Sequence, residues 1–355
     1  MSEQHIDSIR LRPGMYMGDI HDGSAIAHMI WEAVANSVDE HLAGHCTQVT
    51  VTIEEDASVS VEDDGRGVPV HDVAGIPFAQ RALTEFHNSP TLDGHAPHEH
   101  IASSGLGLLP VNALSSWLEL TTFRDGGHYV QRYERGRPTA PLERIEPTGR
   151  TGTRLRFHPD PSIFGGVWFD PGQIATHLRE LSFLLPKLTL RFTDRRQHSF
   201  HEPLGLASYV RTRLRSGIGP ELPMFTLVVG VGDIVVEVAA TWGPAWGGSL
   251  ESFANVQRTT GGGTHVRGLL LGLVDGLRKA TPTSKRRKQL EGALTEGLVA
   301  AVCVRLNDPT YDSPTKSILS TPRVTGVVRR AVREGFEHFL AREPAVLAYL
   351  RNKID

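Results

Sequence analysis

The most informative segments of this sequence are Glu32-Ala-Val-Ala-Asn36 and, further on, Asp63-Asp-Gly-Arg-Gly-Val-Pro69. Glu32 and Asn36 are four residues apart, so both project from one face of a helix. We expect that helix over residues 24–41, with the polar face looking away from the core, toward solvent or toward a site. For these two residues alone, an ordinary solvated face is the alternative. The core-facing stripe is formed by Ile26, Ile30, Val34, Val38 and Leu42.

A glycine-rich turn follows the next strand of the sequence. Gly65 and Gly67 flank Arg66 after the alternating run Val59-Ser-Val61. Glycines at these positions permit a sharp turn and the close approach of a ligand. Asp63, at the end of the strand, is able to accept a hydrogen bond from an exocyclic amine such as that of adenine. Taken alone, the pattern is equally typical of a tight loop.

A second glycine-rich loop, Ser103-Ser-Gly-Leu-Gly107, leads directly into the apolar segment 108–114. Backbone N–H groups at the start of a helix form a natural phosphate-binding site. Thr151-Gly-Thr153 then enters the strand 154–157, where a threonine hydroxyl could reach the nucleotide end of the pocket. Each pattern is weak by itself, and their order along the chain makes the combination specific.

These motifs resemble the nucleotide-binding motifs of the GHKL ATPases, and within that group the ATPase half of DNA gyrase B and its topoisomerase IV counterpart. The resemblance extends over nearly the whole chain, from about Ile9 to the final helix. Further segments that carry it are Arg12-Pro-Gly-Met-Tyr-Met-Gly18, Asn36-Ser-Val-Asp-Glu-His-Leu-Ala-Gly-His45, Val111-Asn-Ala-Leu-Ser115, Leu178-Arg-Glu-Leu-Ser-Phe183, Gly262-Gly-Thr-His265 and Asp308-Pro-Thr-Tyr-Asp-Ser-Pro-Thr-Lys316.

The resemblance implies an α+β fold in two parts. A two-layer α/β sandwich of the Bergerat (GHKL ATPase) type is followed by a transducer domain with a βαβ unit, of ribosomal-protein-like fold. We place the ATP-binding domain at residues 1–200, with an irregular lid over about 70–104, and the transducer at 201–355. In the transducer we expect strands at 225–229, 234–240, 250–257 and 298–306, and one long helix over 324–350.

The resemblance also assigns roles around ATP and Mg²⁺. Glu32 is the expected base that orients and deprotonates the attacking water, and Asn36 the expected oxygen ligand of Mg²⁺. Lys316 is expected to reach the γ-phosphate from the second domain, and Asp63 to bind the adenine amine. The other expected nucleotide contacts are Asp39, Arg66, Gly67, Val68, Pro69, Ser103, Ser104, Gly105, Leu106, Gly107 and Thr153.

Several departures from the family pattern bear on turnover. Ala35 replaces the aspartate that usually precedes the Mg²⁺ asparagine, Ser104 replaces a common histidine, and Pro314 replaces the glutamine before Thr-Lys. The lid segment 86–90 lacks the usual lysine. The residues expected to carry hydrolysis remain, so we expect slow ATP hydrolysis. Arg124 resembles the arginine that aminocoumarin inhibitors contact in gyrase.

Composition limits the partners and the compartment. A net charge of −3 over 355 residues gives no global attraction to nucleic acid. DNA contact through the transducer would need a local patch such as Lys285-Arg-Arg-Lys288, for which a solvated helix end is the alternative. Cys46 and Cys303 fit a reducing cytoplasm, and no apolar run is long enough to span a membrane. We interpret the lid histidines as solvated rather than as metal ligands; they are His95, His98 and His100.

Two functions follow from these observations. The first is an ATP-binding and ATP-hydrolysing gyrase-B-like module, which couples nucleotide state to domain motion in DNA topology change. A separate topoisomerase chain would cleave the DNA, since no Toprim-like segment follows. The arm that clasps the partner in a family homodimer is mostly missing, because the motif begins at Arg12. The second is a regulatory or partner-binding paralogue with little hydrolysis. A histidine kinase is disfavoured because no phospho-acceptor helix pair precedes the domain.

Overall fold

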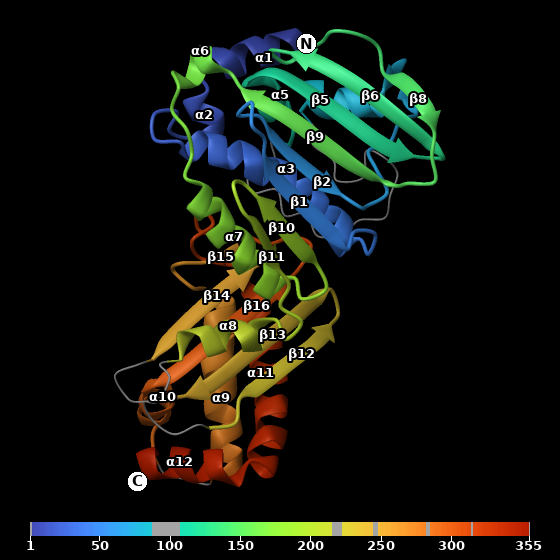
Figure 1. Cartoon of the computed structure of the whole chain (residues 1–355). Helices are drawn as coiled ribbons and strands as arrows, with labels where there is room; N and C mark the ends of the chain where they lie inside the picture. Colours follow the sequence, from blue (N-terminus) through green and yellow to red (C-terminus); the bar gives the residue numbers. More distant parts are fainter. Residues whose placement is uncertain are drawn as a thin grey trace. The chain divides into compact units, whose positions relative to one another are not determined.

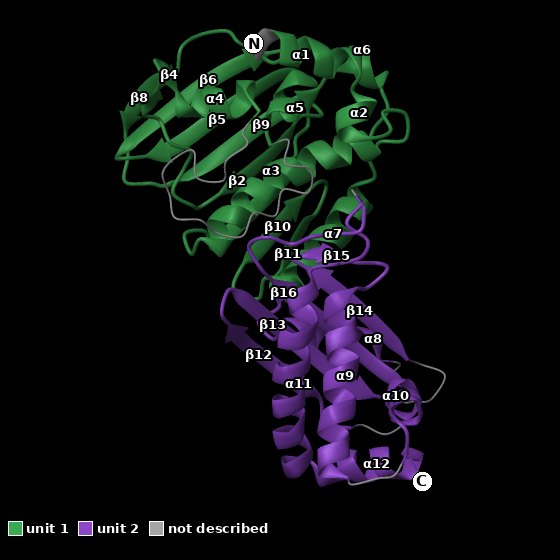
Figure 2. Ribbon diagram, turned by 180° about the vertical axis from the view of Figure 1, so that it is seen from behind, with its two compact units in different colours: residues 1–201 green, residues 202–355 purple. Residues whose placement is uncertain are grey.

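The computed structural model describes residues 2–86, 107–214, 222–243, 248–281, 285–313 and 315–354. The chain divides into two compact units, Met1–His201 and Glu202–Asp355 (Figure 2). Both are α+β, as predicted. Within the described residues, the first unit holds a nine-stranded sheet and the second a five-stranded sheet. None of the described helices is long and apolar enough to cross a membrane.

The first unit is built on a mixed sheet with the strand order β11-β10-β1-β2-β9-β5-β6-β7, in which β8 also pairs with β6 (Figure 1). Its helices are α1 (Ser2–Leu11), α2 (Gly14–Met17), α3 (Ser24–Leu42), α4 (Phe78–Thr84), α5 (Leu109–Ala113), α6 (Pro161–Phe164) and α7 (Pro171–Leu184). The strands of the sheet are β1 (Gln48–Ile53), β2 (Val59–Asp63), β5 (Ser115–Arg124), β6 (Gly127–Glu134), β7 (Arg137–Pro138), β8 (Glu143–Pro147), β9 (Gly152–Pro159), β10 (Thr189–Thr193) and β11 (Gln197–Phe200).

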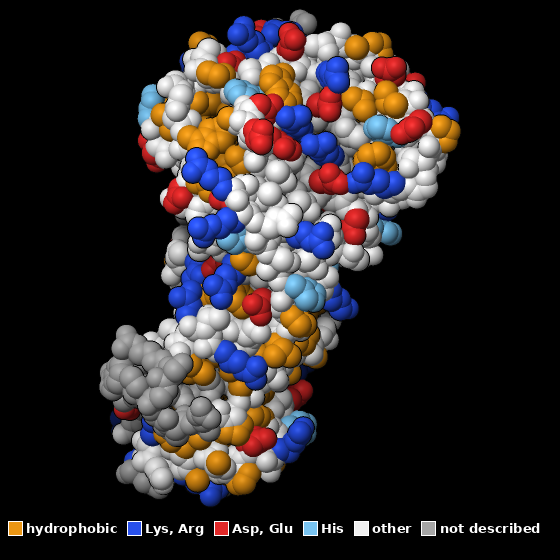
Figure 3. Space-filling model, in the orientation of Figure 1, with side chains coloured by type: hydrophobic (Ala, Val, Ile, Leu, Met, Phe, Trp, Pro, Cys, Tyr) orange, Lys and Arg blue, Asp and Glu red, His pale blue; other side chains and the backbone are white. Residues whose placement is uncertain are grey.

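The two faces of this sheet differ in polarity, and the register shows why. Val51 pairs with Val61, Val61 with Leu155, and Leu155 with Leu120, and all four side chains are buried. Because successive side chains of a strand point to opposite faces, the neighbouring positions of these strands form the other face. There Glu62 pairs with Arg154, and charged side chains of both signs are interspersed (Figure 3). One face is therefore packed and the other open, as in a two-layer sandwich.

Helix α3 begins and ends close to the predicted limits, and its apolar stripe is buried except for the half-buried Leu42. Glu32 is only 4% exposed, so of the two expected positions, toward solvent or toward a site, the solvated one is wrong for this side chain. Asn36 is exposed, as expected. Buried neighbours on that helix include Ala25, Ala27, Met29, Ala33, Ala35 and Ser37.

The first part of the predicted lid is ordered, which corrects the expectation of an irregular segment. The short strands β3 (Asp72–Val73) and β4 (Ile76–Pro77) pair and lead into α4. Leu83 of α4 is fully buried, and Asn112 of α5 donates from Nδ2 to the Leu83 carbonyl at 2.9 Å. This bond satisfies a carbonyl at the end of α4, where no helical partner remains. The remainder of the predicted lid, from residue 87 to about 104, lies outside the described residues.

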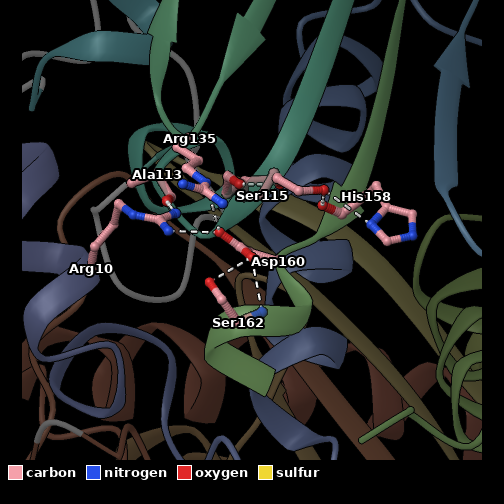
Figure 4. Close-up of polar contacts among 9 residues, drawn as sticks. Arg10, Ala113, Ser115, Arg135, His158, Asp160 and Ser162 are labelled. Atoms are coloured by element: carbon pink, nitrogen blue, oxygen red, sulfur yellow. Dashed lines mark hydrogen bonds and ion pairs between the residues drawn. The ribbon is translucent and has the colours of Figure 1, made fainter. Parts of the chain in front are cut away.

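Helix α1 was not predicted, because its sequence is polar apart from Ile6, Ile9 and the exposed Leu11 at its end. Ile6 and Ile9 are both buried, and Arg10 anchors the end of the helix (Figure 4). Arg10 donates from Nη1 to the Ala113 carbonyl at 2.7 Å, and its Nη2 lies 2.6 Å from Oδ2 of Asp160. Burial alone would raise the pKa of Asp160, but hydrogen bonds from Arg10 and Ser162 lower it. The N-terminal helix is thus fixed to the end of α5.

The second unit has the strand order β12-β13-β16-β14-β15. Its βαβ unit is the predicted one, since β14 and β16 pair in parallel and α9 and α10 connect them. The strands are β12 (Phe225–Val231), β13 (Ile234–Trp242), β14 (Ser249–Ala254), β15 (Gln257–Arg258) and β16 (Leu298–Arg305). The helices are α8 (Leu206–Arg213), α9 (Thr264–Ala280), α10 (Arg287–Thr295), α11 (Pro322–Arg342) and α12 (Pro344–Ile354).

Two expected elements of the second unit are interrupted. The strand predicted over 250–257 ends at Ala254, because Asn255 and Val256 have φ angles of +47° and +59° and form a turn before β15. The single terminal helix is divided into α11 and α12 at Pro344. Proline lacks the backbone N–H that would continue the helical hydrogen bonds, and it restricts the residue before it.

Helices α9 and α11 lie side by side along one face of this sheet (Figures 1 and 2). Gly268, Gly272 and Gly276 recur every four residues on the side of α9 that faces α11. A Cβ atom at Gly272 would lie 2.7 Å from Cβ of Val332 and 2.8 Å from the carbonyl oxygen of Arg329. The glycine stripe therefore permits the close packing of the two helices.

We expect Gly272→Ala to lower the free energy of unfolding by about 1–3 kcal/mol, since the added methyl forces two packed helices apart. Gly326→Ala is the matched control on α11, because a Cβ there meets nothing within 4 Å. In that control, the free energy of unfolding is expected to rise by about 0.5–1 kcal/mol, because alanine has a higher helix propensity than glycine. Urea denaturation measures both. Equal stability changes in the two variants would contradict the packing argument.

Candidate functional site

The carboxylate of Asp63, at the end of β2, is held by donors from three segments. Ser37 on α3 donates from Oγ to Oδ2 at 2.9 Å, while the backbone N–H groups of Gly65 and Thr153 donate to Oδ1 at 2.9 and 3.3 Å. The residue is 7% exposed. Burial raises the pKa of Asp63 to about 6, although all three hydrogen bonds favour the ionised form. The structure thus brings the predicted Asp63 and Thr153 together and adds Ser37, which lies in the motif segment 36–45 but had no predicted role.

The turn after Asp63 requires glycine. Gly67 has a φ angle of +82°, and a Cβ there would lie 2.6 Å from the carbonyl oxygen of Phe123. Two side chains of β5 hold the turn in this position. Thr122 donates from Oγ1 to the Val68 carbonyl at 3.1 Å, and Arg124 donates from Nη1 to the Gly67 carbonyl at 2.6 Å. The predicted residues Gly67 and Val68 are therefore fixed against the sheet, followed by the buried Pro69.

Arg66 pairs with Glu40, another residue of the segment 36–45 that had no predicted role. Its Nη2 lies 2.7 Å from Oε1, its Nε donates to Oε2 at 3.0 Å, and its backbone N–H donates to Oε2 at 3.1 Å. Burial would raise the pKa of Glu40, but the hydrogen bonds and charge of Arg66 prevail and lower it. The pair ties the turn to α3. That Arg66 also covers a bound base remains a prediction.

Helix α3 contributes the other acidic and amide candidates. Glu32 is buried, Asp39 is half-buried, and Asn36 is exposed and donates from Nδ2 to the Glu32 carbonyl at 2.7 Å. Together with Ser37 and Glu40, these residues place five polar side chains in little more than two turns of one helix. Within the described ranges, no group of three or more His, Cys, Asp or Glu side chains is arranged to hold a metal ion.

Part of the predicted phosphate loop is visible. Gly107 has a φ angle of +64° and is followed closely by α5, as expected of a loop that opens a helix. Five other candidates or departures lie outside the described residues: Ser103, Ser104, Gly105, Leu106 and Pro314. The lid histidines, His95, His98 and His100, lie there too.

Lys316 belongs to the second unit. Its φ angle is +55°, its backbone N–H donates to the Ser313 carbonyl at 3.0 Å, and its Nζ lies 5.9 Å from the centre of the Tyr311 ring. The segment that follows Lys316 is bound to the loop before α9. Gly261 donates from its backbone N–H to the Ser317 carbonyl at 2.9 Å, and Leu319 donates to Gly262 at 3.0 Å. The lysine therefore stands on a backbone turn that neighbouring segments hold in place.

A cavity of about 630 Å³ opens on the other, polar face of the first sheet. Its arginines are already paired with glutamates: Arg154 lies 3.2 Å from Glu54, and Arg132 lies 2.8 Å from Glu119. None of the predicted site residues lines it, so it is separate from the candidate site. The lining residues are Glu62, Glu119, Thr121, Phe123, His128, Val130, Gln131, Arg132, Thr139, Ala140, Pro141, Glu143, Ile145, Arg150 and Arg154.

The raised pKa of Asp63 predicts a pH dependence of stability. Between the unfolded value of 3.8 and the folded value of about 6, the folded chain holds a proton that the unfolded chain releases. Unfolding therefore becomes easier as the pH rises through this window. The difference between the two pKa values corresponds to a loss of about 3 kcal/mol in the free energy of unfolding. Asn at position 63 stays neutral, so the Asp63→Asn variant should not lose stability as the pH rises. Urea denaturation from pH 4 to 7 measures the free energy of unfolding of both proteins. A pH-independent difference between the two proteins would contradict the prediction.

Comparison with known proteins identifies the relatives of both units. Residues 21–163 match the family model described as histidine kinase-, DNA gyrase B-, and HSP90-like ATPase, and residues 205–354 match the model described as DNA gyrase B. DNA gyrase B of Thermotoga maritima is 34% identical over 365 residues, covering 98% of this chain and 57% of the relative. The corresponding protein of Halalkalibacterium halodurans is 35% identical, covering 98% and 56%. The chain thus spans a little over half the length of these relatives.

Similar solved structures come from the same group of proteins as these relatives. The 43K ATPase domain of Thermus thermophilus gyrase B, in complex with an aminocoumarin, matches with a TM-score of 0.85 and 30% identity, covering 98% of this chain and 93% of that one. The topoisomerase IV ATP-binding domain of Francisella tularensis, in complex with a small-molecule inhibitor, matches with a TM-score of 0.81 and 27% identity, covering 98% and 95%. The predicted resemblance is confirmed, and the chain belongs to the DNA gyrase B family within the GHKL ATPases.

Proposed function

We propose that the first unit binds ATP and hydrolyses it, as the ATPase part of a gyrase-type topoisomerase. The observation that carries this proposal is the buried Asp63 carboxylate, oriented by Ser37, Gly65 and Thr153 beside the turn at Gly67. A carboxylate held in this way is an acceptor for the amine of adenine. The names of the matched families and structures support the choice of nucleotide.

The residues of α3 suit the chemistry at the phosphate end. We assign to Glu32 the role of base for the attacking water, since its buried carboxylate lies one helical turn before Asn36 on α3. Asn36 fits Mg²⁺: its amide nitrogen is used by the Glu32 carbonyl, which leaves the amide oxygen as a hard ligand. When bound there, Mg²⁺ would supply positive charge that stabilises the phosphates during hydrolysis. Gly107 and the loop before it would supply backbone donors to the phosphates.

The second unit is proposed to sense the nucleotide state as a transducer. Lys316 is assigned to the γ-phosphate, where its charge distinguishes ATP from ADP and favours one domain arrangement over another. The proposed partners are a topoisomerase cleavage subunit and DNA, with a homodimer as a further proposal. Arg287 of the basic run already pairs with Asp275 at 3.0 Å, so any DNA contact there competes with that pair.

The proposed compartment is the cytoplasm, and the alternative function to weigh is a regulatory paralogue. Cys46 and Cys303 are buried free thiols, which supports a reducing cytoplasm. No observation favours the regulatory paralogue, because the relatives reported above carry gyrase or topoisomerase IV names.

The direct test is ATP turnover by the purified full chain in a coupled assay, with and without Mg²⁺. We expect Mg²⁺-dependent release of ADP at a slow steady rate. Turnover equal to that of the buffer would overturn the proposal that the chain hydrolyses ATP.

A further inference from the structure

The hydroxyl of Ser37 occupies one of the acceptor positions of Asp63. A carboxylate offers about four lone pairs, two on each oxygen. Oδ1 accepts the backbone N–H groups of Gly65 and Thr153, and Oδ2 accepts the Ser37 hydroxyl at 2.9 Å. One lone pair therefore remains, on Oδ2 beside Ser37. Ser37 is itself only 2% exposed, so this geometry is enclosed by protein.

Ser37 differs from comparable serines of the same unit. Buried serines in or near helices commonly bond a carbonyl of the preceding turn. Ser182 of α7 does so, donating to the Arg179 carbonyl at 2.7 Å, and Ser115 donates to the Val111 carbonyl at 2.6 Å. Ser37 instead donates across to another element, from α3 to the end of β2. Its hydroxyl thus acts on the orientation of Asp63 rather than on its own helix.

We propose that Ser37 is a positioning residue that makes the site select a 6-amino purine over a 6-oxo purine. This inference rests on the proposed nucleotide site and deepens it. With the carboxylate plane fixed, a single acceptor remains for the base. The amine of adenine donates to it, whereas the O6 carbonyl of hypoxanthine or guanine presents a second acceptor and is repelled. A site built for one hydrogen-bonding group rejects the analogue that lacks it.

The Ser37 hydroxyl also opposes protonation of Asp63, which would weaken the preference for 6-amino purines. A protonated Asp63 would donate a hydrogen bond to a 6-oxo group, so the site would then also bind 6-oxo purines. The hydrogen bond from Ser37 favours the ionised form and so works against the burial that raises the pKa of Asp63 to about 6. The titratable neighbours are Glu40, whose charge also raises this pKa, and Cys46, on which the charge of Asp63 acts. Arg66 in turn pairs with Glu40.

The test compares ADP with inosine diphosphate, neither of which carries a γ-phosphate to be hydrolysed. Calorimetry on the full chain with Mg²⁺ gives the ratio of the two affinities at pH 7.5 and pH 6. We expect Ser37→Ala to reduce the preference for ADP about tenfold, the scale of one hydrogen bond to a charged group, and to reduce it further at pH 6. Ser37→Thr keeps the hydroxyl and should keep the ratio. Ser182→Ala is the control for losing a buried serine hydroxyl, and should also leave the ratio unchanged.

The outcomes separate the two proposals. If the wild-type chain binds neither nucleotide, the proposed function is wrong and this inference is wrong with it. If the wild type prefers ADP but Ser37→Ala keeps the same ratio, or loses both affinities by the same factor, the inference alone is overturned. A lowered ratio in Ser37→Ala with an unchanged ratio in Ser182→Ala supports it.

Discussion

Glu32→Gln is expected to reduce the ATP turnover number by about 10²–10⁴-fold, the usual contribution of a positioned general base. The amide has nearly the same shape but cannot take the proton of the attacking water. Since Glu32 is buried, the substitution also leaves the surface of the chain unchanged. Affinity for a non-hydrolysable ATP analogue should stay within about threefold, because the lost interaction forms only in the transition state.

Glu237→Gln is the matched control for this experiment. Glu237 is another largely buried glutamate, on β13 in the second unit, where it lies 3.7 Å from Arg305. Its substitution should leave turnover unchanged. Steady-state assays compare the turnover numbers of the wild type, Glu32→Gln and Glu237→Gln. Equal turnover in the wild type and Glu32→Gln would show that Glu32 is not the general base.

Lys316→Met is expected to lower the turnover number by about 10²–10³-fold, as expected for the loss of one charge-stabilising group. Methionine keeps the length and apolar contacts of the stem while removing the charge. The substitution should weaken the binding of a non-hydrolysable ATP analogue but not that of ADP, because only the former presents a γ-phosphate.

Lys353→Met provides a control of the same kind, since the Nζ atom of Lys353 also lies over a tyrosine ring, 5.0 Å from the centre of Tyr349. Loss of activity in both variants would indicate a general effect of charge or stability. An unchanged turnover number in Lys316→Met would show that this lysine does not act at the phosphate.

Elements with a regular apolar period were predictable from the sequence. The stripe from Ile26 to Val38 locates α3, and the alternation around Val61 locates β2. Elements that depend on distant contacts were not predictable. Helix α1 is stabilised by Arg10 and the buried Asp160, 150 residues away in sequence. The lid helix α4 likewise depends on a bond from Asn112.

The candidate site shows the same division. Motif order predicted Asp63, Thr153 and Gly67, and the structure places the first two in direct contact. Ser37 and Glu40 lie in the motif segment 36–45, but their roles were not predicted because serine and glutamate on a helix have no distinctive pattern. Their importance arises only when α3 packs against the end of β2 and brings them to Asp63 and Arg66. The burial of Glu32 was missed for a related reason, since the single-stripe pattern does not show how many sides of α3 are covered.

The most direct test of the central claim is titration calorimetry of the intact, folded chain with the magnesium complex of a non-hydrolysable ATP analogue. We expect saturable binding with one nucleotide per chain, weakened in Asp63→Asn. Absence of any binding heat from the folded wild-type chain at several temperatures would contradict it.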